Sequence, residues 1–348
     1  MNLLHGVGDF FSLDIGTHSL RIVQLAGESQ RGWALSRYSY VPIDEKLLND
    51  SSELGRRKLG EAILGAVNQA GIKTKNVAIG MPARKTFTSI VETENLPEKE
   101  LRKVFKYEIE KYVPMAIGDA KADYVLLGVS PNDPAKAEVL VSSTAKEYAE
   151  SMMELVENVG LNVIAMEPEP LAMARALSPV GAMDARMIVD FGEKTTDLVV
   201  VYKDQPRLVR SIPGGFETLV KTVATSLNVK EDQSRQFILK FGLVQDKVEG
   251  QVFKVLEMPL SNYASELAKS VRFFQTKYIN ARVGGIILTG YAAMIPLMAE
   301  YIEAKTGVAT VVGNPWQLVQ MTPEQRQILA GVSNEFAVTV GLAERSND

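Results

Sequence analysis

Alternating apolar and polar positions predict a repeated unit in this chain. Residues 10–25, FFSLDIGTHSLRIVQL, and residues 186–202, RMIVDFGEKTTDLVVVY, each contain an apolar strand, an Asp-apolar-Gly turn and a second strand. Alternation on both sides of a glycine turn is typical of a β-hairpin. The turn aspartates, Asp14 and Asp190, are separated by about half of the 348-residue chain, so we expect a duplicated half-chain unit.

Each predicted hairpin is followed by a third strand and then by alternating helices and strands. In the first half we expect a third strand at 33–41, helices at 53–70, 145–158 and 170–177, and further strands at 77–81 and 161–166. In the second half we expect a third strand at 206–212, helices at 216–227, 230–241, 260–280 and 292–306, and further strands at 284–289 and 308–312. This order predicts an α/β fold with two lobes, whose mixed sheets begin as antiparallel meanders and carry helices on both faces.

Residues 82–143 interrupt the first half and are expected to form a small α/β subdomain. Its predicted elements are a strand at 86–94, an amphipathic helix at 97–112, and strands at 123–129 and 137–143. The chain is longer than the roughly 250–300 residues at which single cores stop growing. The expected domains are therefore a first lobe of 1–81 and 144–182, the inserted subdomain 82–143, and a second lobe 183–348.

Composition removes several classes of function. The net charge is −4 and no run of five Lys or Arg residues occurs, which argues against a nucleic-acid partner. Cysteine is absent and there are two histidines, so we expect any metal to be bound through oxygen. The chain shows neither a secretory signal nor the roughly 20 apolar residues that span a bilayer, which predicts a cytoplasmic protein.

The two Asp-x-Gly turns are candidate phosphate-binding sites. Gly16 and Gly192 predict a left-handed backbone that points successive amide N–H groups inward, towards phosphate oxygens. Side chains that add donors stand beside both turns: Thr17, Ser19 and Arg21 in the first, and Thr195 and Thr196 in the second. Asp14 and Asp190 are expected to hold a hydrated Mg²⁺. The alternative is that Asp-x-Gly is ordinary hairpin chemistry, and the matched spacing of two copies favours the phosphate interpretation.

Three further positions carry candidate chemistry. Gly214 and Gly215 open a predicted helix, whose N-terminal amides suit a phosphate. Gly290 lies between an apolar strand and a helix, where glycine allows the backbone to approach a nucleoside. Glu169 begins another helix, where a carboxylate can orient water against a terminal phosphate. The alternative for both glycine positions is an ordinary turn. The alternative for Glu169 is an acid that the helix dipole favours at a helix N-terminus.

Together these motifs resemble the superfamily of actin, DnaK-type chaperones and sugar kinases. The phosphate-1 loop, phosphate-2 loop and adenosine motif of that superfamily are similar to LDIGTHS, VDFGEKTTD and LTGYAA in this chain. Within it the chain resembles the PilM family of actin-like proteins of type IV pilus assembly, which is close to the cell-division protein FtsA. The stretches that carry this likeness are KYEIEKYVPMAI at 106–117, residues 145–177, the Gly-Gly helix at 214–227, ELAKSVRFFQ at 266–275 and GNP at 313–315.

The resemblance implies a cytoplasmic protein that binds ATP with Mg²⁺, holds the cytoplasmic tail of a PilN-like inner-membrane protein and couples it to the pilus assembly motor. Its membrane association is then peripheral, through that partner. By matching position, phosphate 1 would be lined by Asp14, Gly16, Thr17, His18, Ser19 and Arg21. Phosphate 2 would be lined by Asp190, Gly192, Thr195 and Thr196, with Gly214, Gly215 and Gly290 completing the nucleotide site.

The chain departs from the family pattern at the nucleoside. Tyr291 and Ala292 replace glycines of the adenosine motif, and Arg235 and Ile238 replace a Glu and a Lys that would clamp the ribose and base. These changes predict a weakened site or a different nucleotide.

Functions other than a pilus scaffold are also compatible with these motifs. One is an active ATPase or a sugar-kinase-like phosphotransferase that uses Glu169 or Asp190 to position the nucleophile. Others are an FtsA-like cell-division or filament-forming protein and a platform of type II secretion. The sequence does not exclude self-association. Sedimentation with and without ATP distinguishes a polymer from a scaffold.

Overall fold

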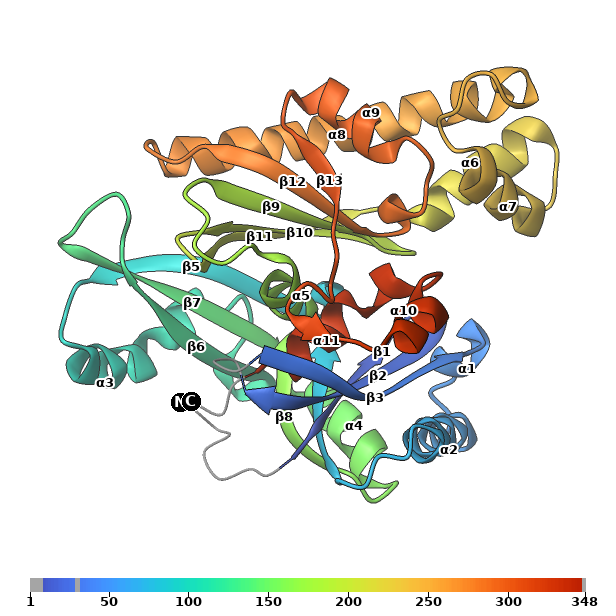
Figure 1. Cartoon of the computed structure of the whole chain (residues 1–348). Coiled ribbons are helices and arrows are strands. Elements are labelled where there is room, and N and C mark those ends of the chain that lie inside the picture. The colour runs from blue at the N-terminus through green and yellow to red at the C-terminus, as the bar shows by residue number, and fades with distance from the viewer. Residues whose placement is uncertain (1–8, 29–31, 346–348) are drawn as a thin grey trace. The chain divides into compact units, whose positions relative to one another are not determined.

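The computed structural model describes residues 9–28 and 32–345, which form two compact units (Figure 1). Unit 1 contains the residues up to 130, residues 135–177 and the residues from 314 onward. Unit 2 contains residues 178–313 together with 131–134. The C-terminal segment from 314 therefore belongs to unit 1, whereas the sequence placed it with the second lobe.

Unit 1 is built on a six-stranded sheet in the order β14-β3-β2-β1-β4-β8. Its strands are β1 (Phe11–Ile15), β2 (Ser19–Glu28), β3 (Gly32–Pro42), β4 (Asn76–Met81), β8 (Asn162–Pro168) and β14 (Val319–Gln320). Its helices outside the inserted subdomain are α1 (Glu45–Leu48), α2 (Glu53–Gln69), α4 (Lys146–Glu157), α5 (Glu169–Leu177), α10 (Pro323–Leu329) and α11 (Ala337–Ala343). Strands β1, β2 and β3 form the expected antiparallel meander, and β4 and β8 continue it in parallel.

The two faces of this sheet are covered by different helices because side chains alternate along β1. Phe11 and Leu13 enter a buried cluster with residues of α2 and α4. Ser12, between them, donates a hydrogen bond of 2.7 Å from Oγ to the carbonyl of Thr339 in α11. Ser12 therefore ties β1 to α11 on the face opposite α2 and α4.

The inserted subdomain is a three-stranded antiparallel sheet with one helix. Its strands β5 (Thr86–Glu94), β7 (Lys136–Ala145) and β6 (Ala120–Val129) are paired in that order, and its helix is α3 (Glu98–Glu108). Leu101 and Phe105 of α3 are buried against Val139 and Val141 of β7. The helix is shorter than expected because residues 109–112 continue as a 3₁₀ turn.

Unit 2 repeats the strand arrangement of unit 1. Its sheet has the order β11-β10-β9-β12-β13. Its strands are β9 (Ala185–Phe191), β10 (Thr195–Tyr202), β11 (Gln205–Pro213), β12 (Val283–Gly290) and β13 (Thr310–Val312). Its helices are α6 (Phe216–Leu227), α7 (Glu231–Phe241), α8 (Gln251–Lys277) and α9 (Met298–Thr306). Apart from the edge strand β14 in unit 1, both sheets have the order third, second, first, fourth and fifth strand, which confirms the predicted duplication.

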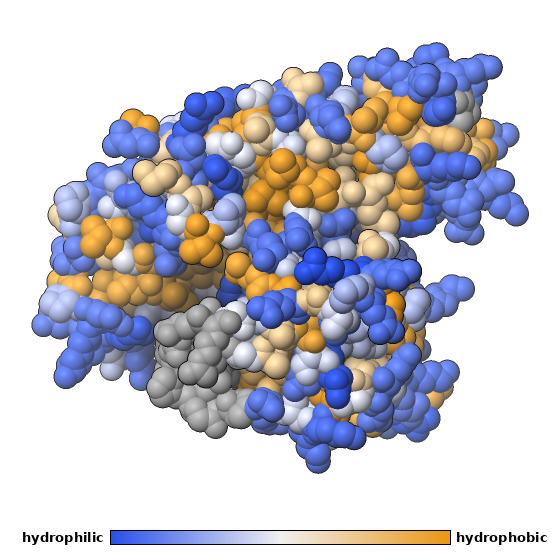
Figure 2. Space-filling view, in the orientation of Figure 1, coloured by the Kyte–Doolittle hydropathy of each residue, from blue (hydrophilic) through white to orange (hydrophobic). Residues whose placement is uncertain are grey.

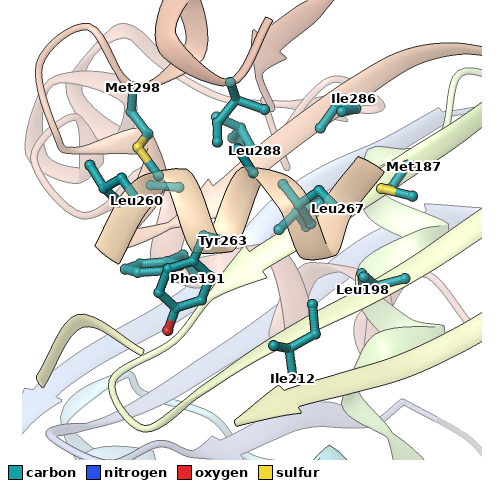
Figure 3. Packing of buried hydrophobic residues seen from close by; sticks show 14 of the residues in the cluster. Met187, Phe191, Leu198, Ile212, Leu260, Tyr263, Leu267, Ile286, Leu288 and Met298 are labelled. Atoms are coloured by element: carbon teal, nitrogen blue, oxygen red, sulfur yellow. The ribbon is translucent and has the colours of Figure 1, made fainter. Parts of the chain in front are cut away.

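Helix α8 supplies much of the core of unit 2. Figure 3 shows Leu260, Tyr263 and Leu267 of α8 packed over side chains from the sheet. The rings of Tyr263 and Phe191 meet edge to face, with 4.8 Å between their centroids. The helix begins at Gln251, whereas we expected it to begin after Pro259. A proline inside a helix costs about 3 kcal/mol of stability. The apolar face of α8 continues on both sides of Pro259, and burying each Leu or Val side chain stabilises the fold by about 1.5–3 kcal/mol, which offsets that cost.

The C-terminal segment was not predicted as secondary structure, and it completes unit 1. Strand β14 extends the sheet edge, where Val319 is paired with Trp33 of β3. Every residue of α11 is buried, so this helix has no polar face from which its period could be recognised. In Figure 1 the red segment that contains α10 and α11 lies beside the blue strands of the meander. The burial of α11 is the physical reason that this segment packs with unit 1.

Candidate functional site

The same hydrogen bond closes both predicted phosphate turns. The Gly16 N–H donates to the Ser19 carbonyl and the Gly192 N–H donates to the Thr195 carbonyl, each at 3.0 Å. Neither glycine has the left-handed backbone that we expected. The glycines allow close approach instead. A Cβ on Gly192 would lie 2.9 Å from the Thr195 carbonyl oxygen, and a Cβ on Gly16 would lie 3.2 Å from the Ser19 carbonyl oxygen and would displace the end of the Arg21 side chain.

In unit 1, Asp14, Arg21 and Tyr40 stand directly opposite one another on β1, β2 and β3. Arg21 Nη2 lies 3.0 Å from Asp14 Oδ2, and Arg21 Nη1 lies 3.4 Å from Oε2 of Glu335, which precedes α11. The Tyr40 hydroxyl donates to Glu335 Oε1 at 3.1 Å, and Ser19 Oγ donates to Glu335 Oε2 at 3.4 Å. One guanidinium therefore bridges two carboxylates.

Burial controls the protonation of this row. It raises the pKa of the Asp14 carboxyl, and the Arg21 guanidinium lowers that pKa in part. Burial also raises the pKa of the Tyr40 phenol, with the Glu335 carboxylate adding to the shift. A phosphate that reached Arg21 would compete with Glu335 for the same cation.

The remaining predicted residues of unit 1 lie around the same edge of the sheet. Thr17 and His18 are half-buried in the β1–β2 turn, and the His18 carbonyl accepts from the Ile43 N–H at 2.8 Å. Glu169 begins α5 beside Gly80 of β4, where an added Cβ would lie 3.3 Å from Glu169 Cγ. Because β1, β4 and β8 are parallel, their carboxyl ends bring the turn and Glu169 to one edge.

In unit 2, the sheet register places Asp190 directly opposite Asp197 and beside the adenosine motif. Gly290 has φ +62°, and a Cβ there would lie 2.2 Å from Asp190 Oδ1, so this position needs glycine. The hydroxyls that we expected at phosphate 2 are engaged within the unit: Thr195 donates to Asp197 Oδ2 at 3.3 Å and Thr196 donates to the Gly214 carbonyl at 3.1 Å.

The start of α6 is packed against the β9–β10 turn. The Phe216 N–H donates to the Gly192 carbonyl at 2.9 Å and the Glu217 N–H donates to the Glu193 carbonyl at 3.0 Å. A Cβ on Gly215 would lie 2.4 Å from the Gly192 carbonyl oxygen, and Gly214 has φ +94°. These two amides bind the turn rather than standing open for a phosphate, as we had expected of the Gly-Gly helix.

Residues that depart from the family pattern meet beside this turn. Arg235 of α7 binds Glu193 with both terminal nitrogens, at 2.6 and 3.1 Å, and its Nη1 lies 3.4 Å from the Tyr291 hydroxyl. The Tyr291 ring is stacked on Phe216, with 4.2 Å between centroids. Ile238 is fully buried in the core of unit 2.

The side chains of the two units differ in how well they suit Mg²⁺, phosphate and nucleoside. Mg²⁺ is bound by one or two carboxylates and keeps several waters; unit 1 offers the carboxylate of Asp14, and unit 2 offers those of Asp190 and Asp197, which face each other. Within residues 9–28 and 32–345 no group of three or more His, Cys, Asp or Glu forms a metal cage. The Arg21 guanidinium has the charge that a phosphate requires, whereas in unit 2 the residues that depart from the family pattern, Arg235 and Tyr291, are bonded to each other.

The sequence interpretation missed four residues of these clusters. Asp197 follows Asp190 by seven positions, as Arg21 follows Asp14, so the repeat itself carried a signal for it. Glu193 lies inside the motif VDFGEKTTD, but the sequence suggested no role for it. Tyr40 and Glu335 had no local signal, because the strand pairing and the C-terminal segment bring them to Arg21.

No helix in the part of the chain that the structure describes is long and apolar enough to cross a membrane.

Comparisons with known proteins give several similar proteins and one family model. The chain is 22% identical to the cell division protein FtsA of Enterococcus hirae, over 91% of this chain and 80% of FtsA. Its structure is similar to that of a PilM-PilN type IV pilus biogenesis complex, with a TM-score of 0.81, 20% identity, and 98% and 99% of the two chains covered. It is also similar to MreB5 of Spiroplasma citri bound to ADP, with a TM-score of 0.52, 13% identity, and 96% and 95% covered.

The fold that these neighbours share is the actin-like fold, as expected from the repeated hairpins. The family model described as type IV pilus assembly protein PilM matches residues 12–347. Because this match spans nearly the whole sequence, the chain belongs to the PilM family of type IV pilus assembly proteins.

Proposed function

We propose that the chain is a nucleotide-binding scaffold of type IV pilus assembly that binds the cytoplasmic tail of a PilN-like inner-membrane protein. The observation that carries this proposal is the match to the PilM family over residues 12–347. The similar solved structure is a complex of PilM with PilN, which supports a partner of this kind. The scaffold would lie in the cytoplasm, reach the inner membrane through this partner and couple it to the pilus motor.

The inserted subdomain offers a surface for the tail. Val139 and Val141 of β7 face α3, so Leu140 between them faces the other side of the sheet. There Leu140 stands between Ile90 of β5 and Val125 of β6; Leu140 is buried, and the Val125 side chain is 55% exposed. Figure 2 shows apolar residues in a band over this subdomain, at the left of the view. The exposed apolar side chain of Val125 is therefore the point at which we infer that an apolar tail segment binds.

A synthetic PilN-type tail peptide tests the partner. We expect it to shift amide resonances of unit 1, and Val125→Asp to weaken its binding about tenfold because a charge then enters an apolar contact. Val311→Asp is the matched control, since Val311 is 58% exposed on β13 of unit 2. If the peptide binds equally well to Val125→Asp, the tail binds at another surface. If the peptide shifts no amide resonance, the proposed partner is rejected.

For the nucleotide, we infer that the β1–β2 and β9–β10 turns contact the phosphates of ATP, that Arg21 supplies positive charge, and that Asp14 and Asp190 hold hydrated Mg²⁺. The identical turn-closing hydrogen bonds at Gly16 and Gly192 support a shared role. Calorimetry with ATP·Mg²⁺ on the wild type and on Asp14→Ala tests the site. Heat that is lost in the variant supports it, and equal heats reject it.

Hydrolysis is a second candidate activity, favoured by the placement of Glu169. Its carboxylate begins α5 at the edge of the sheet that also carries the β1–β2 turn. A carboxylate there suits the positioning of an attacking water, and Asp190 is the alternative residue for this role. A scaffold whose shape responds to bound nucleotide does not require fast turnover.

A further inference from the structure

Four segments of unit 2 converge on one side-chain cluster that includes two departures from the family pattern. The β9–β10 turn supplies Glu193, the first residue of α6 is Phe216, α7 supplies Arg235, and the turn after β12 supplies Tyr291. Each segment except α7 also carries a glycine that the sequence assigned to the nucleotide site. We call these four residues the Arg235 cluster.

The aromatic part of the cluster forms a closed stack. Phe216 is fully buried, and its ring lies nearly parallel to that of Tyr291, at an angle of 7°. The Arg235 guanidinium carbon lies 5.0 Å from the centroid of Phe216 and 5.8 Å from that of Tyr291. Both distances are within the range of cation–π attraction. The rings and the guanidinium therefore hold one another without a ligand.

The charged part of the cluster keeps Arg235 in place. Glu193 accepts hydrogen bonds from both terminal nitrogens of Arg235, and its side chain is only 5% exposed. A bidentate pair of this kind is both strong and geometrically specific. Displacing the guanidinium would leave a buried carboxylate without its counter-charge, which is costly. Arg235 therefore resists movement away from the rings.

The cluster lies beside the carboxylate expected to hold metal. Tyr291 directly follows Gly290, whose α-carbon approaches Asp190, and Glu193 is three residues after Asp190 in the adjoining turn. Resting on the nucleotide site proposed above, we propose that Arg235 and Tyr291 determine its specificity. By covering the face where a nucleoside would approach, they make the site select the magnesium-bound polyphosphate and contribute little affinity for the base.

Competition between ligands tests this inference. In the wild type we expect Mg²⁺-bound ATP, GTP and inorganic tripolyphosphate to bind with Kd values within about threefold of one another. In Arg235→Ala/Tyr291→Gly the face is open, so ATP should bind at least about tenfold more tightly than tripolyphosphate. Glu193→Gln is a milder variant that keeps the side-chain volume and weakens the hold on Arg235, and it should raise the same ratio by severalfold. Arg102→Ala is the control, because Arg102 also forms a 2.6 Å pair with a glutamate, Glu98, but in the inserted subdomain.

The outcomes separate this inference from the proposed function. Wild-type protein that prefers ATP over tripolyphosphate by tenfold or more overturns the specificity assignment and leaves ATP binding intact. Weaker ATP binding in Glu193→Gln or the double variant, with an unchanged melting temperature, makes Arg235 a contact for the nucleoside and likewise overturns it. No binding of any ligand to any variant rejects both proposals.

Discussion

Asp14 and Arg21 face each other across β1 and β2, with 3.0 Å between Oδ2 and Nη2. The equivalent positions of the second repeat are Asp190 and Asp197, which also face each other, across β9 and β10. The duplicated backbone therefore carries an ion pair in unit 1 and two carboxylates in unit 2. The two repeats therefore differ in charge at equivalent positions, with a cation beside the first aspartate and a second acid beside the other.

Removing Arg21 should destabilise unit 1. We expect Arg21→Met to lower the free energy of unfolding by about 3 kcal/mol at pH 7, because buried Asp14 loses its counter-charge. Urea denaturation measures this, and adding Asp14→Asn should restore part of the loss. Arg57→Met, which removes an exposed pair with Glu61, should cost less than about 0.5 kcal/mol. Equal losses from Arg21→Met and Arg57→Met would contradict the buried-pair account.

Gly215 should not tolerate a side chain. In Gly215→Ala the new Cβ meets the Gly192 carbonyl oxygen at 2.4 Å and the Glu193 carbonyl oxygen at 2.6 Å, so the backbone must shift. We expect a loss of about 2–3 kcal/mol in thermal unfolding. Gly65→Ala in α2 is the opposite case, since no atom lies within 4 Å of its Cβ position, and it should stabilise by about 0.5–1 kcal/mol. A variant Gly215→Ala as stable as the wild type would show that α6 is not held tightly against the turn.

Glu344 should make stability depend on pH. Glu344 is the C-cap residue of α11, and its carboxyl is buried with no hydrogen-bond partner among the described residues. Burial raises its pKa to about 8, and the charge of Arg175 opposes this only in part. The folded state therefore holds a proton that the unfolded state releases above its ordinary pKa of 4.5. The stabilising contribution is complete below pH 4.5 and is lost as the pH rises to about 8.

The substitution Glu344→Gln isolates this effect. We expect it to raise the free energy of unfolding at pH 8 by on the order of 3 kcal/mol and to change it little at pH 4. Glu300→Gln, on the exposed side of α9, should stay within about 0.5 kcal/mol at both pH values. A gain from Glu344→Gln of the same size at pH 4 and pH 8 would exclude ionisation as its cause.

Glu169 should affect turnover more than binding. We expect Glu169→Gln to keep ATP affinity within about twofold and to lower the rate of phosphate release by roughly 10²-fold, because the amide no longer accepts a proton from water. Single-turnover phosphate release measures the step directly. Glu157→Gln, at the end of α4, serves as a charge-matched control. If both variants release phosphate at the wild-type rate, Glu169 has no part in hydrolysis.

Local patterns were sufficient for the hairpins of both units. Strand alternation and a glycine turn are properties of neighbouring residues, and the structure places β1–β2 and β9–β10 where the pattern predicted them. The left-handed conformation was wrong because the sequence shows that glycine is required but not why. In the structure the close atoms of the backbone are the carbonyl oxygens of Ser19 and Thr195, three residues after each glycine.

The amino-acid sequence by itself determined the repeated α/β unit, the inserted subdomain and the positions of the paired acidic turns, since all of these depend on residues near one another in the chain. Only the tertiary structure decided that the C-terminal segment packs with unit 1, that α8 continues through Pro259 and that Arg235 binds Glu193, 42 positions away. Burial of α11 and α8 and the pairing of distant charges are gains that appear only when the chain is folded. No local pattern contains them.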